Sequence, residues 1–334
     1  MYAAARHRAE FLHLIGDKTA HGGRRHCNRG TDGDPSAYDT VLLIMGAIID
    51  KITEFIKEML EGWVLDNLET MFTDVNDKVG TIAGEVGQTP SSWNGGIFSM
   101  IRSLSDNVMI PIAGLIISAI LCYELITMVM DKNNMHEMGS EFFFRYLVKA
   151  CIAVMLLSKT FDITMAIFDV GNHIVTNAAG VISGSTSIDV TSTLTTMFNN
   201  QISVMDIGEL IGLGIETMIV SLCMKIMSVL ITVVLYGRMI EIYLYISAAP
   251  VPFATLSNRE WGSIGSNYIK GLCALAFQGF FIMVCVGIYS VLVASVTVAS
   301  NLHTALWSVA AYTVILCFSL FKTGSLAKSI FHAA

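Results

Sequence analysis

The chain has 334 residues, of which 54% are hydrophobic and only 14% are charged. A soluble domain normally carries charge on about a quarter of its residues, so this composition excludes an ordinary soluble protein. The net charge of −7 also excludes a nucleic-acid-binding surface spread over the whole molecule. Charge is concentrated in the N-terminal part, and long apolar runs follow it.

Residues 1–39 are polar and basic and contain no apolar core of the signal-peptide type. We interpret them as a disordered basic tail, read from a start codon upstream of the native one. A basic tail that binds membrane or DNA is the alternative interpretation.

Residues 40–105 are expected to form an extracytoplasmic amphipathic helical region. Apolar residues recur at helical spacing over Val41–Met71, with charges on the other face. The uncharged run Thr40–Ile49 is far shorter than the ~20 residues that a membrane span needs. We therefore expect a helix that lies on the membrane or packs against a neighbouring subunit. Residues 72–105 are polar, with turn residues at Gly87–Gly96.

Residues 106–334 are expected to form a transmembrane helical domain, which makes the predicted fold an all-α polytopic membrane protein. The expected spans are 107–130, 146–170, 207–237, 271–299 and 305–321. Segment 239–256 is also apolar, but Pro250 and Pro252 break its C-terminal half because proline cannot donate a backbone hydrogen bond. We expect this segment to be re-entrant or interfacial on the cytoplasmic side.

Lysine and arginine in the short loops predict the orientation. Lys132, Arg145 and Lys149 flank one loop, and Lys322 and Lys328 follow the last span. The loops 171–205 and 300–304 contain no basic residue. Because basic loops stay in the cytoplasm, the N-terminal region should be outside and the C-terminus cytoplasmic.

Several charges lie within the expected spans, where they are costly and usually face a bundle interior or water. Glu124 and Lys149 lie at comparable depth on neighbouring helices, so we expect them to pair. Lys159 and Asp162 are three residues apart and can pair on one helix face.

Glu216 and Lys225 are nine residues apart, on opposite helix faces, so each needs a partner elsewhere. Two interpretations of all six charges remain open. They are structural pairs and interfacial anchors, or some of them line a hydrated conduit.

The stretch around Pro250 is the candidate gate or docking loop, because non-helical backbone at membrane depth must be covered by protein or face water; a plain turn is the alternative. Arg238 and Glu241 are spaced to form a local ion pair at the cytoplasmic boundary. The candidate residues are Arg238, Glu241, Pro250, Pro252, Arg259 and Trp261.

Motifs for catalysis, cofactors or metal are not found in the sequence. There is no phosphate-binding Gly-x-x-x-x-Gly-Lys-Ser/Thr loop. His136 and Glu137 begin like a zinc-protease motif, but Ser140 stands where the second histidine is required. Six of the seven cysteines fall in apolar segments, as small packing residues, and no Cys-x-x-Cys pair occurs. We expect neither an enzyme nor a bound cofactor or metal.

Four runs resemble the TrbL family of type IV secretion subunits encoded by integrative conjugative elements of Gram-positive bacteria. They are Asp106–Ile116, Lys132–Met138, Leu235–Val284 and Leu320–Phe331. Their order along the chain strengthens the resemblance, which covers residues 41–334. The resemblance implies an oligomeric channel subunit in the cytoplasmic membrane. It also implies partners: secretion ATPases, the coupling protein, other channel subunits and, transiently, single-stranded DNA bound to relaxase.

Two other functions remain open at the level of sequence. A stand-alone secondary transporter would usually show an internal repeat with paired broken helices, and no such repeat is found. A non-conducting assembly scaffold of the same secretion machine has no sequence feature that separates it from a conduit.

Overall fold

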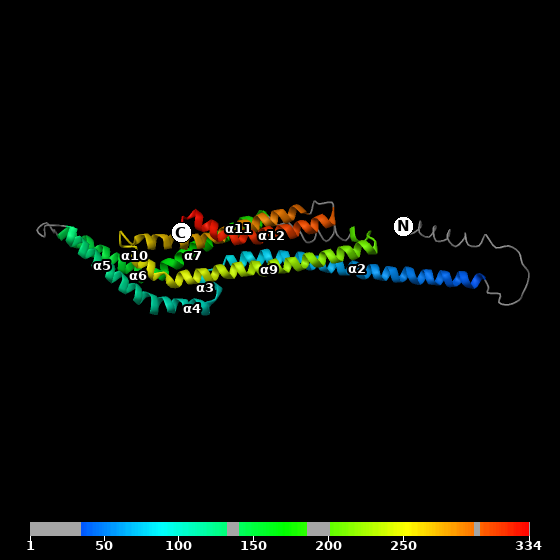
Figure 1. Ribbon diagram of the computed structural model, residues 1–334, viewed down its shortest axis with the longest axis horizontal. Coiled ribbons are helices and arrows are strands. Elements are labelled where there is room, and N and C mark those ends of the chain that lie inside the picture. The colour runs from blue at the N-terminus through cyan, green and yellow to red at the C-terminus, as the bar shows by residue number, and fades with distance from the viewer. Residues whose placement is uncertain (1–34, 132–139, 186–200, 297–300, 334) are drawn as a thin grey trace, which may run out of the picture. The chain divides into compact units, whose positions relative to one another are not determined.

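The computed structural model describes residues 35–131, 140–185, 201–296 and 301–333, and these residues form helices without a β-strand (Figure 1). The residues 1–34, within the expected basic tail, lie outside this description. The chain divides into two units, residues 1–55 and 56–334. The expected all-α polytopic fold is confirmed.

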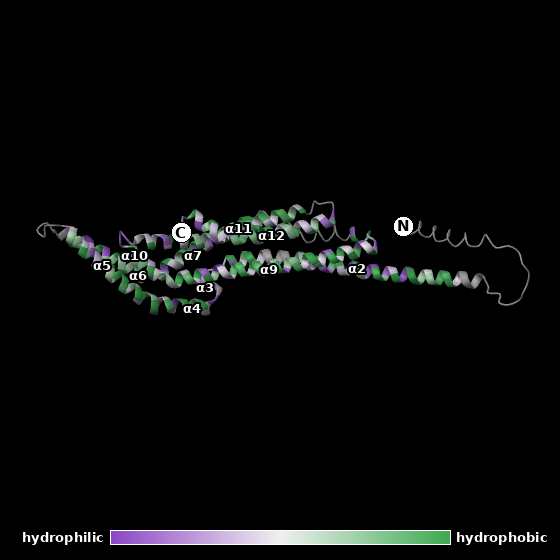
Figure 2. Ribbon diagram, in the orientation of Figure 1, coloured by the Kyte–Doolittle hydropathy of each residue, from purple (hydrophilic) through white to green (hydrophobic). Residues whose placement is uncertain are grey.

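Among the described residues, four helical segments are long and apolar enough to cross a membrane, and there are five if a bent pair of helices forms one span. The four are Gly95–Met130, Ile207–Ala248, Gly262–Val296 and Leu302–Ile330, and the bent pair is Phe143–Ser158 with Thr160–Ile182. Figure 2 shows hydrophobic residues along α9 (Ile207–Ala248), α11 (Gly262–Val296) and α12 (Leu302–Ile330). The protein is therefore a multi-pass membrane protein.

The first span begins earlier than expected, because helix continues from Gly95 instead of starting at residue 107. It consists of α4 (Gly95–Leu104), a π-helical turn η1 (Ser105–Met109) and α5 (Ile110–Asp131). Proline in a helix removes one hydrogen bond and crowds the preceding turn. The wider π turn lies directly before Pro111 and accommodates this residue without ending the helix.

The second span differs from the expected straight helix 146–170. It consists of α6 (Ser140–Ser158) and α7 (Thr160–Ser185), which meet at a 64° bend next to Lys159. The Thr160 hydroxyl donates to the carbonyl oxygens of Leu156 and Leu157, at 3.0 and 2.9 Å. Such hydroxyl bonds compete with the backbone ladder and bend helices.

The third span was expected to end at Gly237, but it is a single helix that continues to residue 248. The break comes at Ala249, because Pro250 and Pro252 supply no backbone donor. Pro250 then begins the short helix α10 (Pro250–Thr255), the position in a helix where proline is best tolerated. Segment 239–256 is therefore the end of α9 followed by α10.

Helix α2 (Pro35–Val86) is the largest difference from the sequence-based expectation. The helix continues through residues 72–86, beyond the stretch Val41–Met71 in which helical spacing was recognised. In the second unit, α2 buries a stripe of apolar residues in one core with α9, α11 and α12 (Figure 1). The stripe consists of Val64, Leu68, Met71, Ile82 and Val86. In the first unit, Val41–Ile49 keeps its large apolar side chains exposed.

Polar contacts between helices supplement this core. Tyr289 of α11 and Thr313 of α12 share a buried hydrogen bond of 2.9 Å, and Gln278 donates to Thr323 at 3.4 Å. Such bonds and close packing hold helices together where lipid removes the hydrophobic driving force.

Gly214 makes the contact between α2 and α9 possible. A Cβ at this position would overlap the Trp63 ring. We expect Gly214→Ala to lower the free energy of unfolding by about 1–3 kcal/mol, as overpacking does. Gly212, two residues earlier, has no atom within 4 Å of such a Cβ, so Gly212→Ala should be neutral or slightly stabilising. Thermal unfolding of both variants in detergent tests this contact, and equal midpoints would contradict it.

Candidate functional site

Glu124 and Lys149 join α5 to α6. Lys149 Nζ donates to Glu124 Oε1, the pair expected from the sequence. The Glu124 side chain is 13% exposed, and its second oxygen is buried without a partner. Lys159 and Asp162 also pair, at 3.2 Å, but both side chains are more than half exposed at the helix bend. Whether any of these four residues lines a conduit stays a prediction.

Glu216 finds its partners on α12. Its carboxylate bonds His303 Nδ1 and accepts from Trp307 Nε1. Lys225, on another face of α9, is exposed and has no polar partner among the residues that the structure describes. Glu216 and Lys225 therefore do not pair with each other, as their nine-residue spacing predicts.

The expected local pair of Arg238 with Glu241 is wrong. Glu241 instead accepts from Lys328 of α12 at 2.7 Å. Arg238 is only 7% exposed and turns toward α7 and α11. Residues three apart on a helix point about 60° apart, so neighbouring helices decide which partner each one meets.

The candidate docking loop is a packed element. Helix α10 packs against α5 and α6 through a small cluster that includes Ala113, Ala153 and Ala254. Beyond it, Asn258 Oδ1 accepts from the backbone N–H groups of Glu260 and Trp261, at 2.7 and 3.1 Å. These bonds fix the turn into α11.

Side chains that could meet a partner remain exposed after α10. Arg259 and Trp261 are exposed, and the Trp261 side chain is 50% accessible. A groove of about 530 Å³ lies beside this turn, between Leu256 and α6, and Arg145 and Lys149 contribute to its wall. The rest of the lining is apolar apart from Ser257, and Lys149 is already paired with Glu124, so Arg145 is the one basic residue of this wall without that partner.

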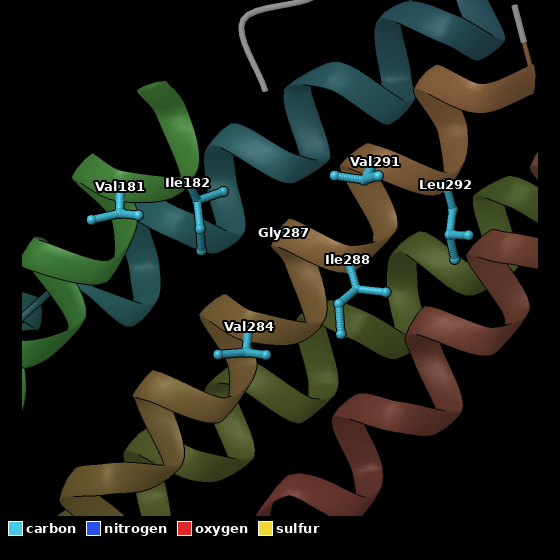
Figure 3. A pocket seen from close by; sticks show the side chains of 7 residues that line it. All are labelled: Val181, Ile182, Val284, Gly287, Ile288, Val291 and Leu292. Carbon is cyan, nitrogen blue, oxygen red and sulfur yellow. The ribbon is translucent and has the colours of Figure 1, made fainter. Parts of the chain in front are cut away.

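A second groove, of about 390 Å³, lies between α7 and α11 (Figure 3). Its lining is entirely aliphatic, apart from the backbone at Gly287. The described residues of this groove therefore offer no side-chain group that could act on a substrate. Likewise, no three His, Cys, Asp or Glu side chains in the described residues are placed to hold a metal ion.

The sequence analysis predicted the charged face of α2 only as far as Met71 and missed its continuation toward Val86. Opposite the buried stripe, α2 exposes Asp66, Glu69, Thr70, Asp77 and Thr81. Because α2 packs beside α9, this acidic face runs along an apolar membrane helix. The continuing apolar spacing through Val75 and Val79 in the sequence was the signal that could have revealed it.

The helices and their paired charges define a polytopic membrane protein without a catalytic constellation in the described residues. A family model for TrbL/VirB6 plasmid conjugal transfer like proteins matches residues 75–250. The chain belongs to this family and is a membrane subunit of a conjugal transfer system. No curated protein and no solved structure matches the chain.

The Glu124–Lys149 pair leads to a stability prediction. Lys149→Met should leave a mostly buried carboxylate without its cation and lower the free energy of unfolding by about 1–3 kcal/mol. The matched change Lys159→Met breaks an exposed pair and should cost less than about 1 kcal/mol. Thermal unfolding midpoints in detergent compare the two, and an equal effect would show that the buried pair has no special weight.

Proposed function

We propose that this subunit forms part of the path by which single-stranded DNA with bound relaxase crosses the cytoplasmic membrane. We further propose that the polar face of α2 lines a water-filled part of that path. The single observation that supports this proposal is a charged helix packed along the most apolar part of a membrane-spanning bundle.

The level of α2 relative to the membrane follows from α9. This helix has 42 residues and is about 63 Å long, twice the ~30 Å hydrocarbon core. Between Glu216 and Arg238 it carries one charge, Lys225, over a length that matches the core. Trp63 lies against Gly214, and Val86 lies beside Arg238. Residues 63–86 of α2 therefore accompany this same stretch.

A charged helix face at this level cannot contact lipid tails. Asp66, Glu69 and Asp77 would each cost several kcal/mol in hydrocarbon, whereas they are stable against water or protein. In an oligomer of this chain, the exposed face of α2 would point inward and the apolar faces of α5 and α9 outward. Like charge on the lining would keep DNA phosphates from binding tightly along the path.

The acidic face also favours a second candidate function, the non-conducting scaffold. A face with Asp66, Glu69 and Asp77 could equally hold a basic surface of another secretion subunit. In both cases the subunit is non-catalytic, and its partners are the secretion ATPase, the coupling protein and further channel subunits. Membership of a conjugal transfer family disfavours the stand-alone transporter.

Cysteine substitution on α2 tests the hydrated face. In a background without native cysteines that retains conjugative transfer, Thr70→Cys and Thr81→Cys should react with a small membrane-impermeant maleimide. Val229→Cys and Val233→Cys on α9, whose native side chains are 64% and 58% exposed, should stay unreactive because they face lipid. If the α2 positions are as unreactive as those on α9, the hydrated face is refuted.

The same variants separate conduit from scaffold. With a photoreactive maleimide attached at Thr70→Cys or Thr81→Cys, a conduit should crosslink to the transferring DNA strand during mating. Crosslinks to another secretion subunit alone would favour the scaffold.

Orientation has its own test. With the N-terminal region outside and the C-terminus cytoplasmic, Arg259→Cys should be labelled only after the membrane is permeabilised. Thr304→Cys, in the first turn of α12 and within the stretch 300–304 that lacks basic residues, should be labelled in intact cells. Labelling of both on the same side would contradict the five-span arrangement.

A further inference from the structure

Arg238 is a buried cation without a partner. Its side chain is 7% exposed, and it makes no hydrogen bond or ion pair with any residue that the structure describes. Its Nε is completely buried and unbonded. Because an arginine guanidinium stays protonated in proteins, this position holds a full positive charge inside the helix bundle.

A small cavity lies next to this guanidinium. Five parts of the chain wall it: the end of α2 with the turn that follows, the start of the short helix α3 (Pro90–Trp93), α7, α9 and α11. The lining residues are Val86, Gln88, Pro90, Phe168, Asn172, Arg238, Ile242 and Ala276. The Asn172 side chain also has a buried amide atom, assigned as Oδ1, that makes no hydrogen bond. The two ends of an asparagine amide exchange by rotation, so Asn172 can present N–H to the cavity.

Small residues make room for this arrangement. A Cβ on Gly279 of α11 would lie 2.9 Å from Arg238 Nη2 and 3.2 Å from Val86 Cγ1. A Cβ on Gly171, beside Asn172, would lie 2.9 Å from the Cβ of Ala276. The two glycines therefore leave space for the guanidinium and for the close packing of α7 on α11.

Size and charge together select the ligand. The centre of a water-sized sphere has about 10 Å³ in which to move, which suits one water molecule or one monatomic ion and excludes phosphate. Water leaves the charge of Arg238 uncompensated, and no carboxylate among the described residues lies within 4.0 Å of it. A buried charge without a counter-charge is strongly destabilising.

We propose that Arg238 and Asn172 bind a single halide ion, chloride under ordinary conditions. The ion neutralises Arg238 and accepts hydrogen bonds from the guanidinium and the Asn172 amide. Since the cavity walls include α2, α7, α9 and α11, the bound ion holds these four helices together. This inference is independent of the conduit proposal, because it uses neither the polar face of α2 nor any DNA contact.

Thermal unfolding of the full-length protein in detergent tests this site. Chloride is replaced stepwise by gluconate, which is too large for the cavity, at constant ionic strength. The midpoint should rise with the logarithm of the chloride concentration once this exceeds the Kd, by about 5 °C at a hundredfold excess. Bromide should replace chloride, and its anomalous scattering should place it beside Arg238.

Two arginine variants make the test specific. Arg238→Gln should abolish the chloride dependence. Arg102→Gln changes an arginine that is 54% exposed and 3.8 Å from Asp106, and it should keep that dependence. An unchanged midpoint of the native protein in gluconate, or a chloride effect that survives in Arg238→Gln, would overturn the proposal. If Arg238→Gln does not fold, the native titration and the bromide position decide, and water in the cavity without bromide counts against the site.

Discussion

Hydrocarbon tolerates neither an unpaired charge nor an unbonded backbone group, and this constraint organises the whole molecule. Glu124 is compensated by Lys149, and Glu216 is bonded by two side chains of α12. Where Pro250 ends α9, the chain goes directly into a short helix covered by α5 and α6. In these places a neighbour satisfies the departure from a plain apolar helix, whereas Arg238 and Lys225 have no such partner among the described residues.

The same constraint applies to helix α2, which is polar where the other helices are apolar. It is too polar to cross a membrane alone, yet its stripe from Val64 to Val86 is buried against three apolar helices. A helix of this kind needs the bundle on one face and a polar environment on the other. The bundle therefore has an apolar side, formed by the other helices, and a polar side, formed by the exposed face of α2.

Much of the fold could be predicted because charges mark where spans end. Asp131 and Pro250 bounded helices as expected, since charge and proline act locally. Helical spacing predicted α2 as far as Met71, but its continuation to Val86 was not found, because hydropathy averages the buried and polar faces of residues 72–86. The bend at Lys159 depends on the hydroxyl bonds of Thr160, which composition does not reveal. For the candidate site, the similar membrane depth of Glu124 and Lys149 was enough to predict that they pair. The partner of Glu241 could not be predicted, because it depends on how α12 packs.

The bend between α6 and α7 divides one crossing between two sets of neighbours. Leu157 before the bend belongs to the cluster with α5 and α10, and Phe161 after it belongs to the cluster with α9 and α11. Helix α10 connects the two sets, because it packs on α5 and α6 and also on α11. A change at the bend can therefore reach both clusters through their contacts.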